Sequence, residues 1–157
     1  MDIQTSTDEA LDADVIIVGG GVTGCAMATA LANGKRRILV LEARTGHKPR
    51  FAGELLHPTG TQVLDDLGFL PTLRHHGGVD VDGFAVVKAL NIPVTRLPYA
   101  EIKNQRPTGF AMEHRDLVTG MREWAEKRPG VTFRFNEKVE EVLRKSHGRV
   151  IGGRTAA

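Results

Sequence analysis

Two apolar runs about twenty residues apart begin the patterned part of the chain. Residues 15–18 are Val-Ile-Ile-Val, and residues 38–41 are Ile-Leu-Val-Leu. Short, continuous apolar runs of this kind are typical of strands buried on both faces of a parallel sheet. Between them, apolar residues recur at the spacing of one helical face, which predicts a helix over about residues 22–33. The residues expected to face the sheet are Met27, Ala28, Leu31 and Ala32.

Shorter elements are predicted along the rest of the chain. Partial alternation and turn residues mark the strands, and helical spacing marks the helices. In the short helix, Val63, Leu64 and Leu67 are expected to point inward. The expected order is a loop at 44–54, a helix at about 59–67, strands at 79–87 and 94–97, a helix at about 115–127, a strand at 131–135, and a hairpin of 139–144 with 149–151.

Three glycines at fixed spacing join the first strand to the first helix. Gly19 permits a tight turn, Gly21 lets a pyrophosphate approach the backbone, and Gly24 lets the helix pack closely on the sheet. The free amides of the first helical turn, which includes Val22 and Thr23, favour phosphate, as does the helix dipole. This spacing predicts a site for the adenosine diphosphate half of a dinucleotide. The alternative is a glycine-rich turn without a ligand.

An acidic residue ends the second apolar run. Glu42 follows Gly19 at the spacing of about twenty residues that suits a carboxylate accepting hydrogen bonds from the adenosine ribose. Ala43, directly after it, is assigned to the same site. A carboxylate here would repel a 2′-phosphate, and Arg44 weakens that argument without reversing it. With the glycine turn, Glu42 predicts an α/β fold containing a Rossmann-like βαβ unit, followed by a small antiparallel β-meander.

Composition excludes several classes of function. The net charge is +2 and the basic residues are scattered, so we expect no nucleic-acid partner. The single cysteine, Cys25, cannot form an intrachain disulfide, which favours a reducing, cytoplasmic compartment, and we expect it to be buried and inert. The histidines lack the spacing of a metal site, so no metal is expected. No apolar run has the length of a membrane span.

Two further segments, together with the glycine unit, carry a resemblance to a known family. Residues 50–60, Arg-Phe-Ala-Gly-Glu-Leu-Leu-His-Pro-Thr-Gly, precede Val-Leu-Asp-Asp-Leu-Gly at 63–68. The second segment begins His-Arg-Asp-Leu at residue 114. These resemble the R-x-x-G-E-x-L-x-P-x-G…L-x-x-L-G run and the arginine-bearing helix of FAD-dependent monooxygenases, the aromatic-ring hydroxylases, and most of all the squalene-epoxidase-like branch. The resemblance covers nearly the whole chain after residue 13.

The resemblance implies a cofactor, a reaction and further site residues. It implies FAD, whose flavin activates dioxygen so that one oxygen atom enters an apolar or aromatic small-molecule substrate, with NAD(P)H as the reductant. Arg50 and Leu55 would lie on the flavin side, and Arg115 near the pyrophosphate or ribityl chain. Val139 would offer backbone groups to the adenine. No catalytic residue is assigned.

The resemblance also sets the expected domain organisation. Residues 1–13 are expected to be a flexible tail, and residues 14–157 a partial FAD-binding domain with a substrate-side sheet starting at about 79–98. The family's Asp-Gly and Gly-Asp motifs would lie beyond residue 157. We therefore expect a sheet that is incomplete on its C-terminal side, and a truncated or split product with a separately encoded C-terminal half as a potential partner.

Other functions stay open at this point. Another flavoprotein of the same superfamily, such as a halogenase or a polyprenyl reductase, would share the same N-terminal unit. A truncated, non-catalytic nucleotide-binding remnant is the alternative outside the enzymes. The expected location is cytoplasmic, and association of the complete enzyme with a membrane surface is left open.

Overall fold

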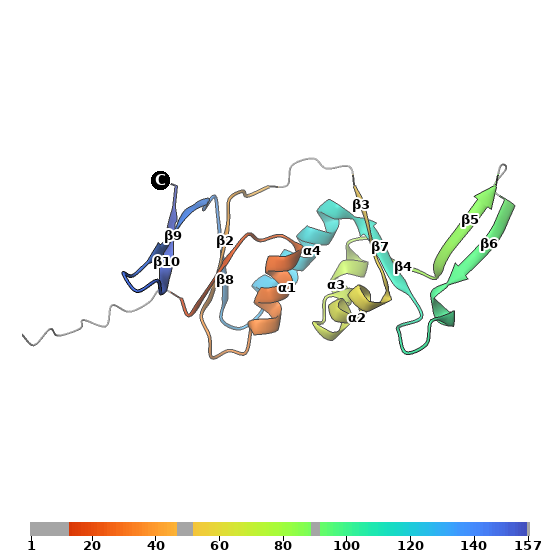
Figure 1. Cartoon of the computed structure of the whole chain (residues 1–157), viewed down its shortest axis with the longest axis horizontal. Helices are drawn as coiled ribbons and strands as arrows, with labels where there is room; N and C mark the ends of the chain where they lie inside the picture. The colour runs from red at the N-terminus through yellow and green to blue at the C-terminus, as the bar shows by residue number, and fades with distance from the viewer. Residues whose placement is uncertain (1–12, 47–51, 89–91, 157) are drawn as a thin grey trace, which may run out of the picture.

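The computed structural model describes residues 13–46, 52–88 and 92–156. The described part of the chain forms an elongated body, with a two-stranded hairpin at each end (Figure 1). A parallel sheet and an antiparallel sheet lie between the hairpins, and helices pack between the two sheets. The expected tail, residues 1–13, lies outside the described residues except for Ala13.

The parallel sheet is built from the apolar runs that the sequence pattern marked as strands. Its order is β1 (Val15–Val18), β2 (Ile38–Glu42), β8 (Val131–Phe135), and both neighbouring pairs are parallel. Helix α1 (Val22–Leu31) connects β1 to β2. Ala28 of α1 packs with Ile38 and Val40 of β2 in a buried cluster. The predicted βαβ unit and the strand at 131–135 are confirmed. Strand β1 is not buried on both faces as predicted, because it is an outer strand of this sheet and its Ile16 and Val18 are 39% and 62% exposed.

Helix α4 (His114–Glu126) joins the two halves of the molecule. It packs on α1 and on α3 (Leu70–His75), and its bounds differ by one residue at each end from the predicted helix. The side chains between these helices form the larger core. Its buried members are Cys25, Leu64, Phe69, Leu70, Leu73, Phe110, Met112, Leu117, Met121 and Ala125.

The antiparallel sheet was not predicted as such. It has the order β3 (Gly53–Leu56), β7 (Gly109–Glu113), β4 (Val79–Val81). The predicted loop at 44–54 is therefore wrong at its end, where β3 begins, and β7 and α3 were missed. Helix α2 (Pro58–Asp66) corresponds to the predicted short helix. It begins at a proline, whose fixed φ and missing amide suit the first helical turn.

The predicted strand at 79–87 is wrong as a single element. It divides at Gly83, where φ is +152°, into β4 and β5 (Gly83–Lys88), which belong to different sheets. Strand β5 pairs antiparallel with β6 (Ile92–Pro98) in the hairpin at one end of the molecule (Figure 1). A short 3₁₀ helix, η2 (Tyr99–Glu101), leads from β6 back toward the antiparallel sheet.

The hairpin at the other end confirms the prediction for the C-terminal region. Strands β9 (Val139–Arg144) and β10 (Val150–Thr155) pair antiparallel. Their turn is closed by the Gly148 amide, which donates to the carbonyl of Lys145. The second strand runs four residues further than predicted.

Two side chains expected to be inside lie outside. Met27 and Val63 are both about half exposed. On α1, Ala28 is buried as predicted, and the other buried positions are those of Gly24, Cys25 and Thr29. These small residues let the helix approach its neighbours closely, so the longer Met27 is placed toward solvent. Among the described residues, no helix has the length and apolar character of a membrane span.

Candidate functional site

The glycine turn between β1 and α1 has the geometry that its spacing predicts. Gly19 has φ +100°, which side-chain-bearing residues rarely adopt, and its amide donates to the carbonyl of Leu41 at 2.8 Å. A Cβ on Gly24 would overlap the carbonyl oxygen of Gly19. The tight turn at Gly19 and the close helix packing at Gly24 are therefore confirmed as requirements of the backbone.

Gly21 differs from these two glycines, because nothing in the described structure requires it to be small. Its φ is −85°, which any residue adopts, and a Cβ built there would have no heavy atom within 4 Å. Gly21 is also the N-cap of α1, and no side chain caps the amides of the first turn, which includes Val22 and Thr23. Open space beside unsatisfied amides at a helix N-terminus fits a phosphate group.

Glu42 lies beside this turn at the end of β2. Its Oε2 accepts a hydrogen bond from the Gly20 amide at 2.8 Å, and its Oε1 accepts one from the Arg44 amide at 3.1 Å. The carboxylate is thus fixed against the turn while its side chain keeps 16% of its surface exposed. Ala43 follows it, just past the carboxyl end of β2. The predicted pairing of glycine turn and acid is present.

Arg122 completes this arrangement and was not predicted. From α4, its Nε donates to the carbonyl of Gly20 at 2.6 Å, and its Nη2 lies 3.3 Å from Oε2 of Glu42. Its guanidinium lies 5.4 Å from the centre of the Phe135 ring. Arg122 and Gly20 are 102 positions apart, so no local spacing in the sequence could have indicated this contact.

The segment leading to Val139 also lies near Glu42. Phe135 pairs with Glu42 in the parallel sheet, and the Glu137 amide donates to the Glu42 carbonyl at 3.0 Å. Val139 follows at the start of β9, paired with Thr155. The structure therefore brings the glycine turn, Glu42, Ala43 and the segment of Val139 to one edge of the molecule.

The remaining predicted residues lie near the start of α4 or outside the described chain. Arg115, in the first turn of α4, is 70% exposed and pairs with Asp116. It precedes Arg122 by two helical turns on the same face, about 10 Å along the axis. Leu55 is partly exposed on β3, which is tied to α4 by the hydrogen bond from the His114 amide to the Ala52 carbonyl. Arg50 lies outside the described residues.

Cys25 lies under the glycine turn. It is fully buried, and this burial raises the pKa of its thiol to about 12. Its Sγ donates weakly to the carbonyl of Gly20. The predicted burial is confirmed, and a thiol that stays protonated is a poor nucleophile.

A second polar cluster joins α2 to the hairpin of β5 and β6. The Tyr99 hydroxyl and Nδ1 of His57 are 2.7 Å apart, and the Phe84 ring packs near both rings. Tyr99 is buried, whereas Phe84 is nearly half exposed. The sequence pattern did not indicate this contact. Among the described residues no group of His, Cys, Asp and Glu is arranged to hold a metal ion.

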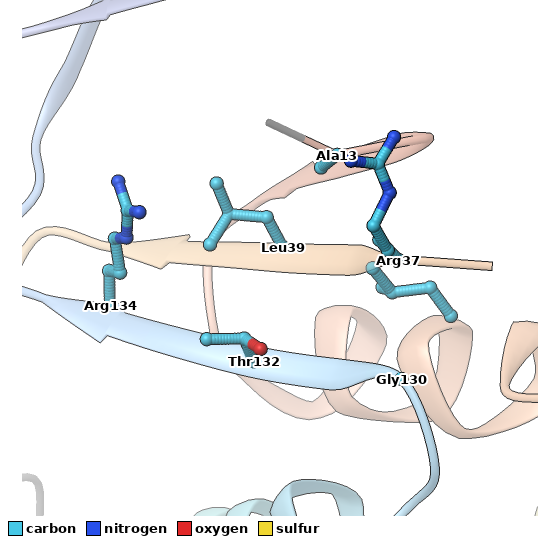
Figure 2. A pocket seen from close by; sticks show the side chains of 7 residues that line it. Ala13, Arg37, Leu39, Gly130, Thr132 and Arg134 are labelled. Atoms are coloured by element: carbon cyan, nitrogen blue, oxygen red, sulfur yellow. The ribbon is translucent and has the colours of Figure 1, made fainter. Parts of the chain in front are cut away.

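A hollow of about 240 Å³ lies on the parallel sheet, away from the glycine turn. Figure 2 shows Leu39 of β2 and Thr132 of β8 side by side on its floor, with Arg37 and Arg134 beside them. Because Ile38 and Val40 face α1, the alternation along β2 places Leu39 on the opposite face. The hollow also borders the amino ends of β2 and β8, whereas the turn lies at the carboxyl ends. It does not belong to the site around Gly21.

The chain matches known proteins over most of its length. Residues 12–151 match the model of the family described as FAD binding domain. The chain is 33% identical over 144 residues to squalene epoxidase erg1 of Schizosaccharomyces pombe, covering 90% of this chain and 31% of that protein. It is 33% identical over 148 residues to squalene monooxygenase of Mus musculus, covering 94% and 26%. The chain thus spans about a third of these relatives or less.

The fold also matches solved structures. The crystal structure of p-nitrophenol 4-monooxygenase PnpA from Pseudomonas putida DLL-E4 superposes with a TM-score of 0.71 at 26% identity. The match covers 83% of this chain and 33% of that one. It agrees with the α/β fold expected from the glycine unit.

Proposed function

Because the chain belongs to the FAD binding domain family, we propose that its glycine turn and Glu42 hold the adenosine diphosphate half of FAD. The observation that carries this proposal is the open space at Gly21. Two neighbouring glycines are required by the backbone, whereas Gly21 is unconstrained by the chain and borders uncapped helix amides. A ligand that must approach the backbone explains why a residue without a side chain is present there.

Each part of the adenosine half has a partner in this proposal. The pyrophosphate lies against Gly21 and the amides of Val22 and Thr23, where the helix dipole favours negative charge. Glu42 accepts hydrogen bonds from the ribose, with Ala43 beside it. The adenine lies along the backbone near Val139, which supplies hydrogen-bonding groups without specific side-chain chemistry.

The flavin half extends toward the start of α4. Arg115 carries an exposed guanidinium about 10 Å along the same helix face from Arg122, so it extends past the turn in the direction of the antiparallel sheet. In this proposal it donates charge-assisted hydrogen bonds to the pyrophosphate or ribityl chain. Leu55 of β3, together with Arg50, borders the flavin.

We further propose that the complete enzyme is a flavin-dependent monooxygenase. Bound flavin supplies the oxygen-activating chemistry, with NAD(P)H as the external reductant. The matched relatives are named for squalene, a small apolar molecule, and this favours an apolar hydrocarbon substrate over a polar aromatic one. Such a substrate partitions into lipid, so the complete enzyme would act as a peripheral protein on the cytoplasmic side of a membrane.

The substrate side is proposed to begin at residues 79–98. The β5 and β6 hairpin presents apolar side chains to the exterior, with Phe84, Val94 and Leu97 each 45% exposed or more. An apolar strand surface of this kind suits a water-excluding substrate cavity. Because the chain spans about a third of its relatives, the remaining walls of that cavity are proposed to come from residues outside these 157, within one longer chain or from a separate half.

A ligand titration tests the cofactor assignment. The purified chain is titrated with FAD, NAD and NADP, with flavin fluorescence and thermal unfolding as the two measurements. The expected result is saturable binding of FAD in preference to both nicotinamide dinucleotides, with a rise in Tm that increases with FAD concentration. A folded chain that binds none of the three, or that prefers NADP, would contradict the proposal.

A further inference from the structure

We propose that Arg122 is a positioning residue that holds Glu42 in the orientation needed to bind the adenosine ribose. This inference rests on the proposed function, because it concerns the same ribose site. Arg122 does not itself contact the cofactor in this account. It acts through the carboxylate and through the backbone of the glycine turn.

The two oxygens of Glu42 have different surroundings. Oε2 faces two donors, the Gly20 amide at 2.8 Å and Nη2 of Arg122 at 3.3 Å. Among the described residues, Oε1 accepts from one donor, the Arg44 amide at 3.1 Å. A carboxylate oxygen has two lone pairs, so Oε1 retains one for a ribose hydroxyl. By engaging Oε2, Arg122 fixes which oxygen is turned toward the ligand.

Arg122 also holds the turn against which Glu42 rests. Gly20 is buried, its amide is bonded to Glu42 and its carbonyl to Nε of Arg122 at 2.6 Å. Both backbone groups of one glycine are thus satisfied by two side chains that also contact each other. A displacement of Arg122 would release the Gly20 carbonyl and the Glu42 carboxylate together.

The shape of the guanidinium explains why arginine suits this position. Its planar group presents Nε to one acceptor and Nη2 to another in a fixed fork, which a lysine ammonium cannot reproduce. The Phe135 ring lies 5.4 Å from the guanidinium carbon and supports its orientation. With 12% of its side chain exposed, Arg122 is shielded from competing water.

The test compares ADP with 2′-deoxy-ADP, which lacks one ribose hydroxyl. The wild-type chain is expected to bind ADP about tenfold or more tightly than 2′-deoxy-ADP, the ratio expected for one hydrogen bond to a charged group. R122M is expected to reduce this ratio to below about threefold, and R122K to leave an intermediate ratio. In an E42Q background, R122M should change the ratio no further.

Arg74→Met is the matched control, because Arg74 also pairs with a carboxylate and lies over an aromatic ring, but outside the site. It should leave the ratio at the wild-type value. A purely structural role for Arg122 would weaken both nucleotides equally, and an unchanged ratio in R122M overturns the inference.

Amide exchange of Gly20 gives a readout that needs no ligand. R122M is expected to accelerate exchange at Gly20 at least tenfold while leaving exchange in the core of α4 unchanged; equal exchange at Gly20 overturns the inference. If the folded wild-type chain binds neither ADP nor FAD, the proposed function fails. The exchange measurement still decides whether Arg122 holds the turn.

Discussion

The parallel-sheet half and the hairpin of β5 and β6 differ in how their side chains are used. In the first, side chains bond to backbone groups, whereas in the second, apolar side chains face the solvent. Around the glycine turn, side chains from two distant segments satisfy backbone groups, as Glu42 and Arg122 do at Gly20. In the hairpin, apolar side chains such as Val94 and Leu97 are more than half exposed. The first region is organised within the chain itself, whereas the second presents a surface that suits a further partner or a substrate.

This difference matches two proposed roles, a dinucleotide site at the glycine turn and a substrate surface at the hairpin. A dinucleotide site must be rigid before its ligand arrives, because small displacements of the turn or acid lose hydrogen bonds. A substrate surface is formed only when the elements around it are present. Exposed apolar residues in strands are therefore expected where a substrate or a further partner would pack, and Val18 at the end of β1, 62% exposed, shows that they are not confined to the hairpin.

The largest expected effect tests the rigidity of the turn. In Gly24→Ala, the new methyl group would overlap the Gly19 carbonyl, so the turn and α1 must separate. The free energy of unfolding should fall by about 3 kcal/mol, the upper range for overpacking. Denaturant unfolding measures this.

Gly60→Ala in α2 is the matched control for that change, since its Cβ would meet Leu56 at an ordinary 3.7 Å. It should be neutral or stabilising by up to about 1 kcal/mol. Equal stability of the two variants would show that the turn has room to adjust.

A smaller effect concerns the contact between α3 and α4, which lies between the two regions, where Glu123 of α4 bonds to His76 and Lys127. The Lys127 ammonium, followed by His76, lowers the pKa of the Glu123 carboxyl from 4.5 to about 2. Its contribution is therefore complete above about pH 4.5 and is lost as the pH falls toward 2. Glu123→Gln should flatten the fall in stability over this window, as measured by urea unfolding at several pH values. A parallel decline in both proteins would contradict the assignment.

The smallest expected effect lies on the hairpin. Val94→Thr replaces an exposed apolar side chain by a polar one that also favours strands, so the stability of the isolated chain should change by less than about 0.5 kcal/mol. Thermal unfolding measures this. A loss above about 1.5 kcal/mol would mean that Val94 already packs within this chain, and the contrast between the two regions would fail.

The sequence predicted those elements whose signal is local. The strands of the βαβ unit are formed by continuous apolar runs, and the spacing of the glycines between them is typical of a tight turn into a helix. The strands and the glycine turn were therefore both predicted. Strand β3 was missed because its partner, β7, lies more than fifty residues away and only that pairing makes Gly53–Leu56 a strand. Helix α3 has only six residues, too few for a helical period to be evident.

The residues of the site also differ in whether a local sequence signal predicts them. Gly19, Gly24 and Glu42 follow a fixed spacing along one short segment, and the structure confirms their arrangement. Arg122 reaches Gly20 across 102 positions, so no local spacing could reveal it. That Arg122 faces inward becomes evident only from the folded structure, in which Gly20 and Glu42 lie beside it. The roles given to Arg115, Leu55, Arg50 and Val139 rest on the family resemblance and stay predictions.

The central claim is that Gly21 is small because a pyrophosphate lies against it. Its direct test is a titration of Gly21→Val with FAD, compared with wild type and with Gly152→Val on β10, where an added Cβ has one neighbour within 4 Å among the described residues, the end of Leu143. The account predicts a loss of FAD affinity of about a hundredfold or more in Gly21→Val alone, with thermal unfolding of the ligand-free protein within a few degrees of wild type. Unchanged FAD affinity in a folded Gly21→Val protein would contradict it.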